Sequence, residues 1–171
     1  MRALGKDNTL LYLVRHGISE DLHPDQMDRD RKLTLKGIEK MKLGAEGMKR
    51  ILDPPQVILT SPYNRTVSTC EIIRGVFHDS EAISSDLLKP GEGSGGITSF
   101  LSSMKASRVL LVGHEPGLSR LITFLTTGTE SPYNEMKKGA LAVLSFSSSI
   151  HQGLGTLQCL ISPKILRLLA K

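Results

Sequence analysis

The chain has 171 residues, of which 39% are hydrophobic and 23% charged, and its formal net charge at pH 7 is +5. This length and composition exclude a disordered chain, and no apolar run approaches the roughly 20 residues that a membrane-spanning helix needs. The basic residues are spread along the chain, and only three Tyr, four Phe and no Trp are present, so we expect no stacking surface for nucleic acid.

The first predicted element is a buried strand over residues 10–15, after a lead-in at residues 1–9 that we expect to be loose at its start. Its five apolar residues, 10–14, are typical of a strand covered on both faces. The run ends in Arg15-His16-Gly17, which brings a cation and an imidazole to the carboxyl edge of a sheet, where open α/β folds bind ligands. The apolar run is too short for a signal peptide and no small-residue cleavage site follows it, so we expect a cytoplasmic protein.

Residues 18–32 are polar and form a predicted loop at the mouth of this sheet edge. We interpret its charged run, Asp28 to Lys32, as a solvated rim. Helical spacing of apolar residues begins after Thr34, a good N-cap, and Asp53-Pro54-Pro55 ends it.

The rest of the chain alternates between predicted strands and helices. The elements are a strand at 56–59, a helix capped by Asn64, a strand at 82–84, a glycine-rich mobile connection at 86–96, a helix at 97–105, a strand at 108–112, a helix with Pro116 at its first position, a polar loop at 126–138, strands at 140–146 and 155–161, and a helix at 164–170 after Ser162-Pro163. This order predicts one α/β domain over residues 1–171, a three-layer α/β/α sandwich with a mostly parallel central sheet. Cys70 and Cys159 both lie among apolar neighbours and are interpreted as small core residues rather than a disulfide.

Two later apolar runs also end in basic or imidazole side chains. One is followed by Thr60-Ser61-Pro62-Tyr63-Asn64-Arg65, and the other by Gly113-His114-Glu115-Pro116-Gly117. A single strand end of this kind more often only faces water, but three at one sheet edge favour a binding site. The residues that they contribute are Arg15, His16, Arg65 and His114. Two guanidinium groups and two imidazoles form an anion-binding set in which either histidine could be a nucleophile.

We assign the nucleophile to His16, which lies at the sharpest strand-to-glycine break beside Arg15. A hydrogen bond from its other ring nitrogen to a carbonyl would orient the imidazole, and nearby Arg15 and Arg65 would disfavour its protonation. Arg65 stands in the first turn of a predicted helix, where a cation opposes the helix dipole, so its placement indicates a role other than helix stability. The alternative is that Arg65 only forms an ion pair with Glu71 or Glu115.

Several segments resemble the histidine phosphatase (phosphoglycerate-mutase-like) superfamily. They are LVRHGIS, LTSPYNRTVST and LLVGHEPGLSRLI, while LTLKG, KKGALAVLSF and LISPKILRLL resemble its short SixA-type phosphohistidine phosphatase branch. The resemblance covers residue 10 to the C-terminus. It implies a phosphoglycerate-mutase-like fold and a phosphatase in which His16 is phosphorylated and then hydrolysed by water. It also implies that Arg15, Arg65 and His114 bind the phosphoryl group.

Further phosphate contacts are expected from Gly17, Ser19 and Asn64. The four principal side chains already supply positive charge and hydrogen-bond donors, and no carboxylate cluster suited to magnesium lies beside the motifs. We therefore expect neither a metal ion nor another cofactor.

A general acid is not evident in the sequence. The candidates are Glu20, Asp86, Glu92 and Glu115, and none has the sequence context of the acid that larger members of the superfamily place near segment 86–96. A phosphohistidine needs little acid, because its P–N bond is labile and imidazole is a better leaving group than an alkoxide. The missing acid therefore favours phosphohistidine on a protein, such as a histidine-containing phosphotransfer domain.

Two other hypotheses stay open on the sequence alone. The first is a phosphomonoesterase for a small phosphate ester, with loop 18–32 or 86–96 closing over the substrate and bringing an acid into place. The second is a module that binds phosphorylated partners without turnover, which the intact His16 disfavours because binding alone needs no nucleophile.

Overall fold

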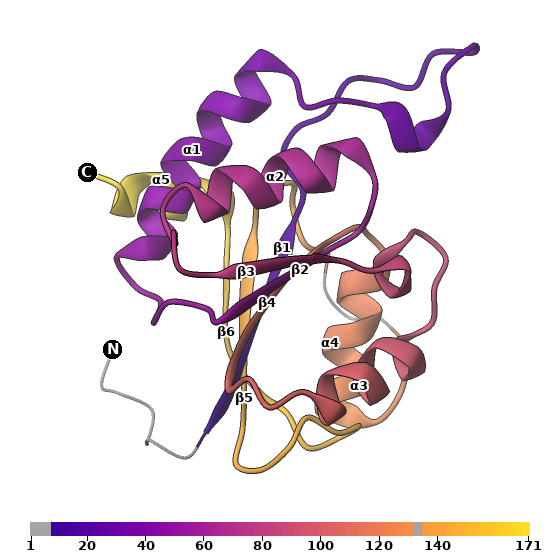
Figure 1. Ribbon diagram of the computed structural model, residues 1–171, viewed down its shortest axis with the longest axis vertical. Coiled ribbons are helices and arrows are strands. Elements are labelled where there is room, and N and C mark those ends of the chain that lie inside the picture. The colour runs from indigo at the N-terminus through magenta and orange to yellow at the C-terminus, as the bar shows by residue number, and fades with distance from the viewer. Residues whose placement is uncertain (1–7, 132–134) are drawn as a thin grey trace.

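Six strands form one central sheet in the computed structural model, which describes residues 8–131 and 135–171 (Figure 1). The strands are β1 (Thr9–Arg15), β2 (Val57–Thr60), β3 (Glu81–Ser84), β4 (Arg108–Gly113), β5 (Leu141–Phe146) and β6 (Thr156–Ile161). Their order is β3-β2-β4-β1-β5-β6; the first four are parallel, and β5 runs antiparallel to its neighbours β1 and β6. The predicted α/β fold with a mostly parallel sheet is confirmed.

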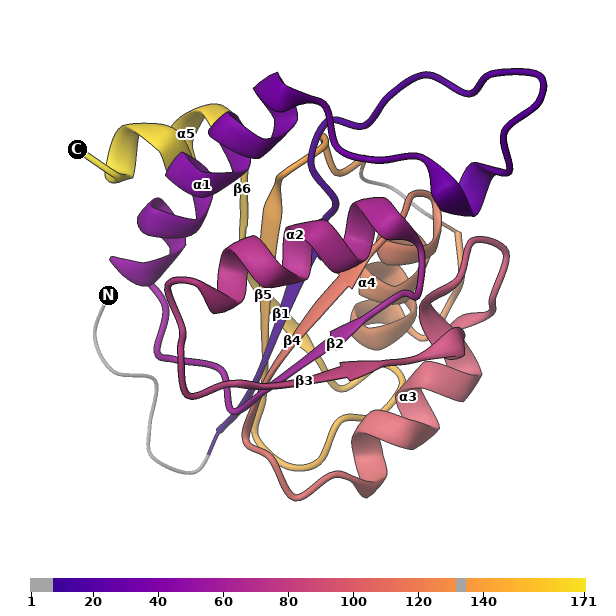
Figure 2. The same cartoon turned by 45° about the horizontal axis from the view of Figure 1, so that its top comes forward.

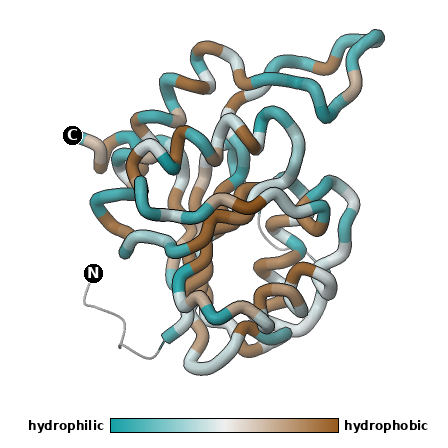
Figure 3. Tube along the Cα trace, in the orientation of Figure 1, coloured by the Kyte–Doolittle hydropathy of each residue, from teal (hydrophilic) through white to brown (hydrophobic). Residues whose placement is uncertain are grey.

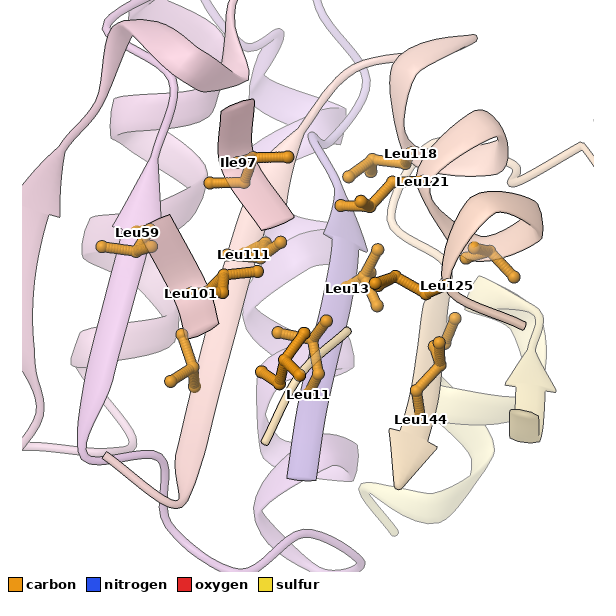
Figure 4. Close-up of a cluster of buried hydrophobic side chains, with 14 of the residues drawn as sticks. Leu11, Leu13, Leu59, Ile97, Leu101, Leu111, Leu118, Leu121, Leu125 and Leu144 are labelled. Carbon is orange, nitrogen blue, oxygen red and sulfur yellow. The ribbon is translucent and has the colours of Figure 1, made fainter. Parts of the chain in front are cut away.

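Helices cover both faces of the sheet, as Figures 1 and 2 show. The helices are α1 (Leu35–Lys49), α2 (Asn64–Arg74), α3 (Ser94–Ser103), α4 (Gly117–Thr127) and α5 (Pro163–Leu169), with short 3₁₀ turns at Asp28–Asp30 and Asp86–Leu88. Apolar residues of α3 and α4 share one buried cluster with the sheet, and those of α1, α2 and α5 share a second. Figure 4 shows the cluster beneath α3 and α4.

Strand β1 supplies side chains to both clusters because successive residues of a strand point to opposite faces. Leu11 and Leu13 lie in the cluster beneath α3 and α4, whereas Leu10, Tyr12 and Val14 lie in the other. Figure 3 shows the corresponding hydrophobic band through the strands. This two-sided burial fixes the direction in which β1 delivers Arg15 and the residues after it.

Two of the predicted helix starts are confirmed and others are not. The Thr34 hydroxyl accepts the Gly37 N–H at 3.0 Å, and the Ser162 hydroxyl accepts the Ile165 N–H at 3.5 Å. Asn64 is not an N-cap, because Tyr63 holds that position and the Asn64 amide instead donates to the Asp30 carbonyl. Pro116 precedes α4 as its N-cap residue rather than opening its first turn.

The predicted mobile connection at 86–96 is partly helical. It contains the 3₁₀ turn at Asp86–Leu88, and α3 begins at Ser94 rather than at residue 97. The cause is a distant partner: the Glu130 carboxylate accepts the Ser94 N–H at 2.9 Å. Residues 1–7 of the predicted lead-in and residues 132–134 of the predicted loop 126–138 lie outside the described residues.

Residues 18–33, here called the arm, extend away from the sheet between β1 and α1 (Figures 1 and 2). Ser19 and Leu33 form an isolated antiparallel bridge at its base, and the 3₁₀ turn at Asp28–Asp30 folds back toward α2. The segment predicted as a solvated loop is therefore partly ordered by contacts of its own.

Cys70 is buried, Cys159 is partly buried, and both are free thiols, as the sequence predicts. Within the described ranges, no helix is both long enough and apolar enough to cross a membrane.

Candidate active site

The residues that end the three central parallel strands line one cavity of about 310 Å³. Arg15 ends β1 and His16 follows it, Arg65 stands in the first turn of α2 after β2, and His114 follows β4. The structure thus brings together all four residues that the motifs single out. The cavity wall also includes Asp28, Arg31, Pro90, Glu115 and Lys138.

One nitrogen of the His16 imidazole is hydrogen-bonded, and the other has no hydrogen bond to any residue that the structure describes. Its Nδ1 lies 2.7 Å from the Gly17 carbonyl oxygen. Because a carbonyl only accepts, the proton is on Nδ1 and the lone pair of the neutral ring is on Nε2. Burial, together with the nearby Arg65 and Arg15 charges, lowers the pKa of His16 to about 4 against the opposing effect of the Gly17 bond. The His16 ring is therefore neutral near pH 7, with its lone pair on Nε2.

His114 packs beside His16, with ring centroids 5.2 Å apart, and is also neutral. Its Nε2 lies 2.9 Å from the Ser61 hydroxyl. Burial, and then the charge of Arg65, lower the pKa of His114 to about 3. Its Nδ1 is buried and has no hydrogen-bond partner in the structure.

The two arginines are anchored by their terminal nitrogens. Arg65 donates from Nη1 to the Asp28 carbonyl at 2.6 Å and from Nη2 to the Asp28 carboxylate at 2.8 Å. Arg15 donates from Nη1 to the Met136 carbonyl at 2.6 Å. The Nε atoms of both arginines are buried and, like His114 Nδ1, have no partner among the described residues. Buried polar groups are almost always hydrogen-bonded, so three such nitrogens in side chains that line one cavity indicate an anionic ligand.

Asp28 and Ser61 are contacts that the sequence analysis missed. The Asp28 carboxylate bridges Arg65 and Arg31, at 2.8 Å from each, and so ties the arm to the start of α2. Burial alone would raise the pKa of Asp28, but hydrogen bonds from Arg31 and Arg65 hold it below its usual value. Ser61 follows β2 at the same sheet edge as the other site residues, and this placement was the one signal that could have identified it.

The three further phosphate contacts that the sequence suggests are used elsewhere. The Gly17 N–H donates to the Thr69 hydroxyl at 3.1 Å, and the Ser19 hydroxyl accepts from Arg31 at 3.0 Å. The Asn64 amide, as noted above, donates to the arm. None of these residues lines the cavity, because each polar group has a partner that draws it into the surrounding structure.

Of the four candidate acids, only Glu115 lines the cavity. Burial raises the pKa of Glu115, although its carboxylate accepts the Ser119 hydroxyl and the Met136 N–H. Glu20 accepts the Lys32 N–H, and Asp86 pairs with Lys89. Glu92 lines a neighbouring cavity that also reaches His114.

Arg65 also does not pair with either carboxylate considered for it. Its partner is Asp28, while Glu71 pairs with Arg74 on the exposed side of α2. In residues 8–131 and 135–171, no group of three or more His, Cys, Asp or Glu side chains is placed to hold a metal ion.

Comparison with known proteins assigns the family. A model of the histidine phosphatase superfamily (branch 1) matches residues 11–89. An uncharacterized protein of Picosynechococcus sp. is 30% identical over 134 residues, which cover 77% of this chain and 81% of that protein. The chain belongs to the histidine phosphatase superfamily. It is accordingly a phosphatase, and its substrates are phosphorylated molecules.

Solved structures confirm the phosphoglycerate-mutase-like fold of this histidine phosphatase. The protein histidine phosphatase SixA complexed with tungstate has a TM-score of 0.81 at 24% identity and covers 92% of this chain and 99% of its own. A candidate phosphohistidine phosphatase SixA from Agrobacterium tumefaciens has a TM-score of 0.75 at 22% identity, with 91% and 98% covered. The mycobacterial glucosyl-3-phosphoglycerate phosphatase has a TM-score of 0.69 at 15% identity, with 91% and 99% covered.

The low pKa of His16 leads to a prediction about pH. With the neutral His16 imidazole as the expected nucleophile, kcat/KM should stay constant down to pH 5 and fall only as the pH drops through about 4. An unperturbed imidazole would lose activity already near pH 6.5. The measurement is an NMR titration of His16, assigned with a His16→Asn variant, beside kcat/KM for p-nitrophenyl phosphate corrected for the ionisation of the substrate. A His16 signal that titrates near 6.5 would contradict the deduced neutral, buried ring.

Proposed function

We propose that this phosphatase acts without a metal ion by transferring a phosphoryl group to Nε2 of His16, and that its substrate is phosphohistidine on a protein. The observation that carries the proposal is a set of three buried, unpartnered nitrogens, Arg15 Nε, Arg65 Nε and His114 Nδ1, in side chains that line the same cavity as the neutral His16 ring. The donors suit the oxygens of a phosphoryl group, and the free lone pair suits attack on its phosphorus. We further propose that the chain forms one catalytic domain, since all six strands belong to one sheet.

The reaction has two steps. In the first, Nε2 of His16 attacks phosphorus in line and the bond from phosphorus to the substrate's imidazole breaks. The substrate ring, which carries a proton on its other nitrogen, leaves with the bonding electron pair as neutral imidazole. In the second, water attacks the phosphohistidine, His16 leaves with its electron pair, and inorganic phosphate is released. Arg15, Arg65 and His114 donate hydrogen bonds to the phosphoryl oxygens, where negative charge is greatest in both steps.

Ser61 acts on this chemistry through His114. If the Ser61 hydroxyl donates to Nε2, the proton of the neutral ring stays on Nδ1 and is available to the phosphoryl group. Ser61 is therefore a positioning residue. Its place in the scheme follows from the 2.9 Å contact and from the absence of any partner at Nδ1 within the described structure.

Substrate choice follows from the leaving group. A general acid contributes roughly 10²–10⁴ in rate. Imidazole and nitrophenolate need little of this help, whereas an alkoxide needs all of it. We therefore expect kcat/KM for a phosphohistidine protein and for p-nitrophenyl phosphate to exceed that for glycerol 3-phosphate by roughly 10²-fold or more. The measurement is a kcat/KM panel with these three substrates, at one pH and ionic strength.

Glu115 favours a second candidate function, a phosphomonoesterase for a small phosphate ester. It lies in the cavity wall, and burial raises its pKa toward the range of a proton donor. The discriminating variant is Glu115→Gln, with Glu92→Gln as its control outside the catalytic cavity. If glycerol 3-phosphate is the better substrate and Glu115→Gln selectively removes that activity, the small-ester function replaces the phosphohistidine function.

A further inference from the structure

A second cavity, of about 130 Å³, adjoins the catalytic one on the side of α1 and α5. Three cationic side chains line it, and each comes from a different part of the fold: Lys40 from α1, Lys138 from the segment before β5, and Arg167 from α5. We call this space the basic cavity. Figure 2 shows α1 and α5 side by side.

The two cavities share a wall. Lys138 lines both, and Gly17, which lines the basic cavity, directly follows His16. The Gly139 N–H fixes this junction by donating to the carbonyls of both Arg15 and His16, at 3.0 and 3.1 Å. Gly139 adopts φ +81, a conformation that side-chain-bearing residues rarely adopt. Lys138 is therefore held between the two spaces by the backbone beside it.

Two glycines of α1 line the basic cavity. A Cβ at Gly37 would lie 2.1 Å from the Ile18 carbonyl oxygen, so only glycine permits α1 to approach the start of the arm this closely. Gly44, about two turns further along α1, also lines the cavity, and a Cβ there would contact nothing nearer than Met41. The absence of a side chain at Gly44 thus leaves room in the basic cavity.

The three cations are partly buried and none forms an ion pair with a carboxylate in the described structure. Burial, then the charges of Arg15 and Arg31, lower the pKa of Lys138, which Asp21 partly offsets. Like charges that are partly removed from water repel one another unless an anion joins them. The Lys138 charge lies toward the arginines of the catalytic cavity, and Lys40 and Arg167 add positive charge on the side of the basic cavity. Cations that border both cavities therefore favour an anionic ligand group.

We propose that the basic cavity is an accessory site for a second anionic group of the substrate, a carboxylate or phosphate other than the phosphoryl group that is transferred. This proposal rests on the proposed function, because it places the transferred group beside His16 and the second anion on the far side of Lys138. The substrate class is then a phosphorylated molecule with a further negative charge next to its phosphoryl group. The source of that charge is either a carboxylate of a protein substrate or a second acidic group of a small ester.

The test compares two small phosphates that differ at one group. Glycerol 3-phosphate and 3-phosphoglycerate have the same chain length, but only the second carries a carboxylate. We expect 3-phosphoglycerate to inhibit turnover of p-nitrophenyl phosphate roughly tenfold more tightly than glycerol 3-phosphate, the size of one charge-assisted hydrogen bond. Lys40→Ala and Arg167→Ala should remove this difference and leave kcat/KM for p-nitrophenyl phosphate within twofold of wild type, since neither residue lines the catalytic cavity.

The controls are Lys42→Ala on α1 and Lys164→Ala on α5, both exposed lysines outside the basic cavity. A second arm measures KM for a phosphorylated histidine-containing phosphotransfer domain with the same four variants. A selective effect of Lys40→Ala and Arg167→Ala on this arm alone assigns the anion to a protein carboxylate, and an effect on the inhibitors alone assigns it to a small ester. An effect on both arms also supports the site.

Binding of the same two inhibitors to His16→Ala by calorimetry separates this proposal from the proposed function. In the His16→Ala background, 3-phosphoglycerate should still bind about tenfold more tightly than glycerol 3-phosphate. Adding Arg167→Ala should still remove this preference, whatever the role of His16. The accessory site is overturned if neither arm responds beyond the lysine controls. It is also overturned if p-nitrophenyl phosphate turnover falls in parallel with the other substrates.

Discussion

The His16→Ala variant should lose turnover by about 10⁴-fold or more, the size of effect seen when a covalent nucleophile is removed. The reason is that the Nε2 lone pair of the neutral His16 ring is available, because the hydrogen bond to Gly17 holds the proton on Nδ1. The other imidazole of the cavity, His114, already contacts Ser61 with its Nε2. Brief incubation of the wild type with ³²P-labelled substrate should leave acid-labile, alkali-stable label on the protein. The same incubation should leave His16→Ala unlabelled.

Two controls make this result specific. His78→Ala removes an exposed histidine in the loop between α2 and β3, outside the cavity wall, and this variant should retain both label and turnover. Thermal unfolding of His16→Ala should be cooperative, which separates loss of the nucleophile from loss of the fold. Label that survives in His16→Ala but disappears in His114→Ala would assign the nucleophile to His114.

Arg65→Ala should lower kcat by roughly 10²–10³, the usual cost of removing one donor to a charged transition state. Arg65 is almost fully buried, its Nε has no partner in the described structure, and its charge adds to the burial that lowers the pKa of His16. Single-turnover kinetics with p-nitrophenyl phosphate measure this loss at the phosphoryl-transfer step.

Two variants separate a direct role from an indirect one. Arg74→Ala removes an arginine of the same helix whose ion pair with Glu71 is exposed, and it should change kcat less than twofold, as expected of a surface ion pair. Asp28→Asn breaks the contact between Arg65 and the arm while the guanidinium stays. If Asp28→Asn costs as much as Arg65→Ala, or if Arg65→Ala costs less than tenfold, Arg65 serves the arm and not the phosphoryl group.

The sequence predicts the fold well where the signal is local. The apolar runs before Arg15, Arg65 and His114 identify three central strands, because a strand buried on both faces has no polar positions. Their common direction then places the three basic or imidazole ends at one edge. The predicted start of α3 was wrong because the Glu130 carboxylate accepts the Ser94 N–H from 36 residues away. A pattern read over neighbouring residues cannot include so distant a pair.

The same distinction applies to the site. The arginines and histidines follow strand ends directly, so the sequence indicates them. Asp28 lies 37 residues from Arg65, in a charged run that is indistinguishable from a solvated loop. Asn64 has the chemistry of an N-cap, yet it turns to the arm, because the fold of residues 18–33 brings the Asp30 carbonyl within its reach. Long-range partners decided each of these assignments.

The contact between Asp28 and Arg65 has a thermodynamic consequence for ligand binding. A free arginine side chain has about 2 kcal/mol of rotamer entropy to lose when it is fixed. Two hydrogen bonds from Arg65 to Asp28 restrict this freedom while the cavity still awaits its ligand, so the ordering occurs when the chain folds rather than at each encounter with substrate. Release of the arm from α2 would leave the Arg65 charge in place and restore the motion of its side chain. Phosphate would then bind more weakly through a less favourable entropy of binding.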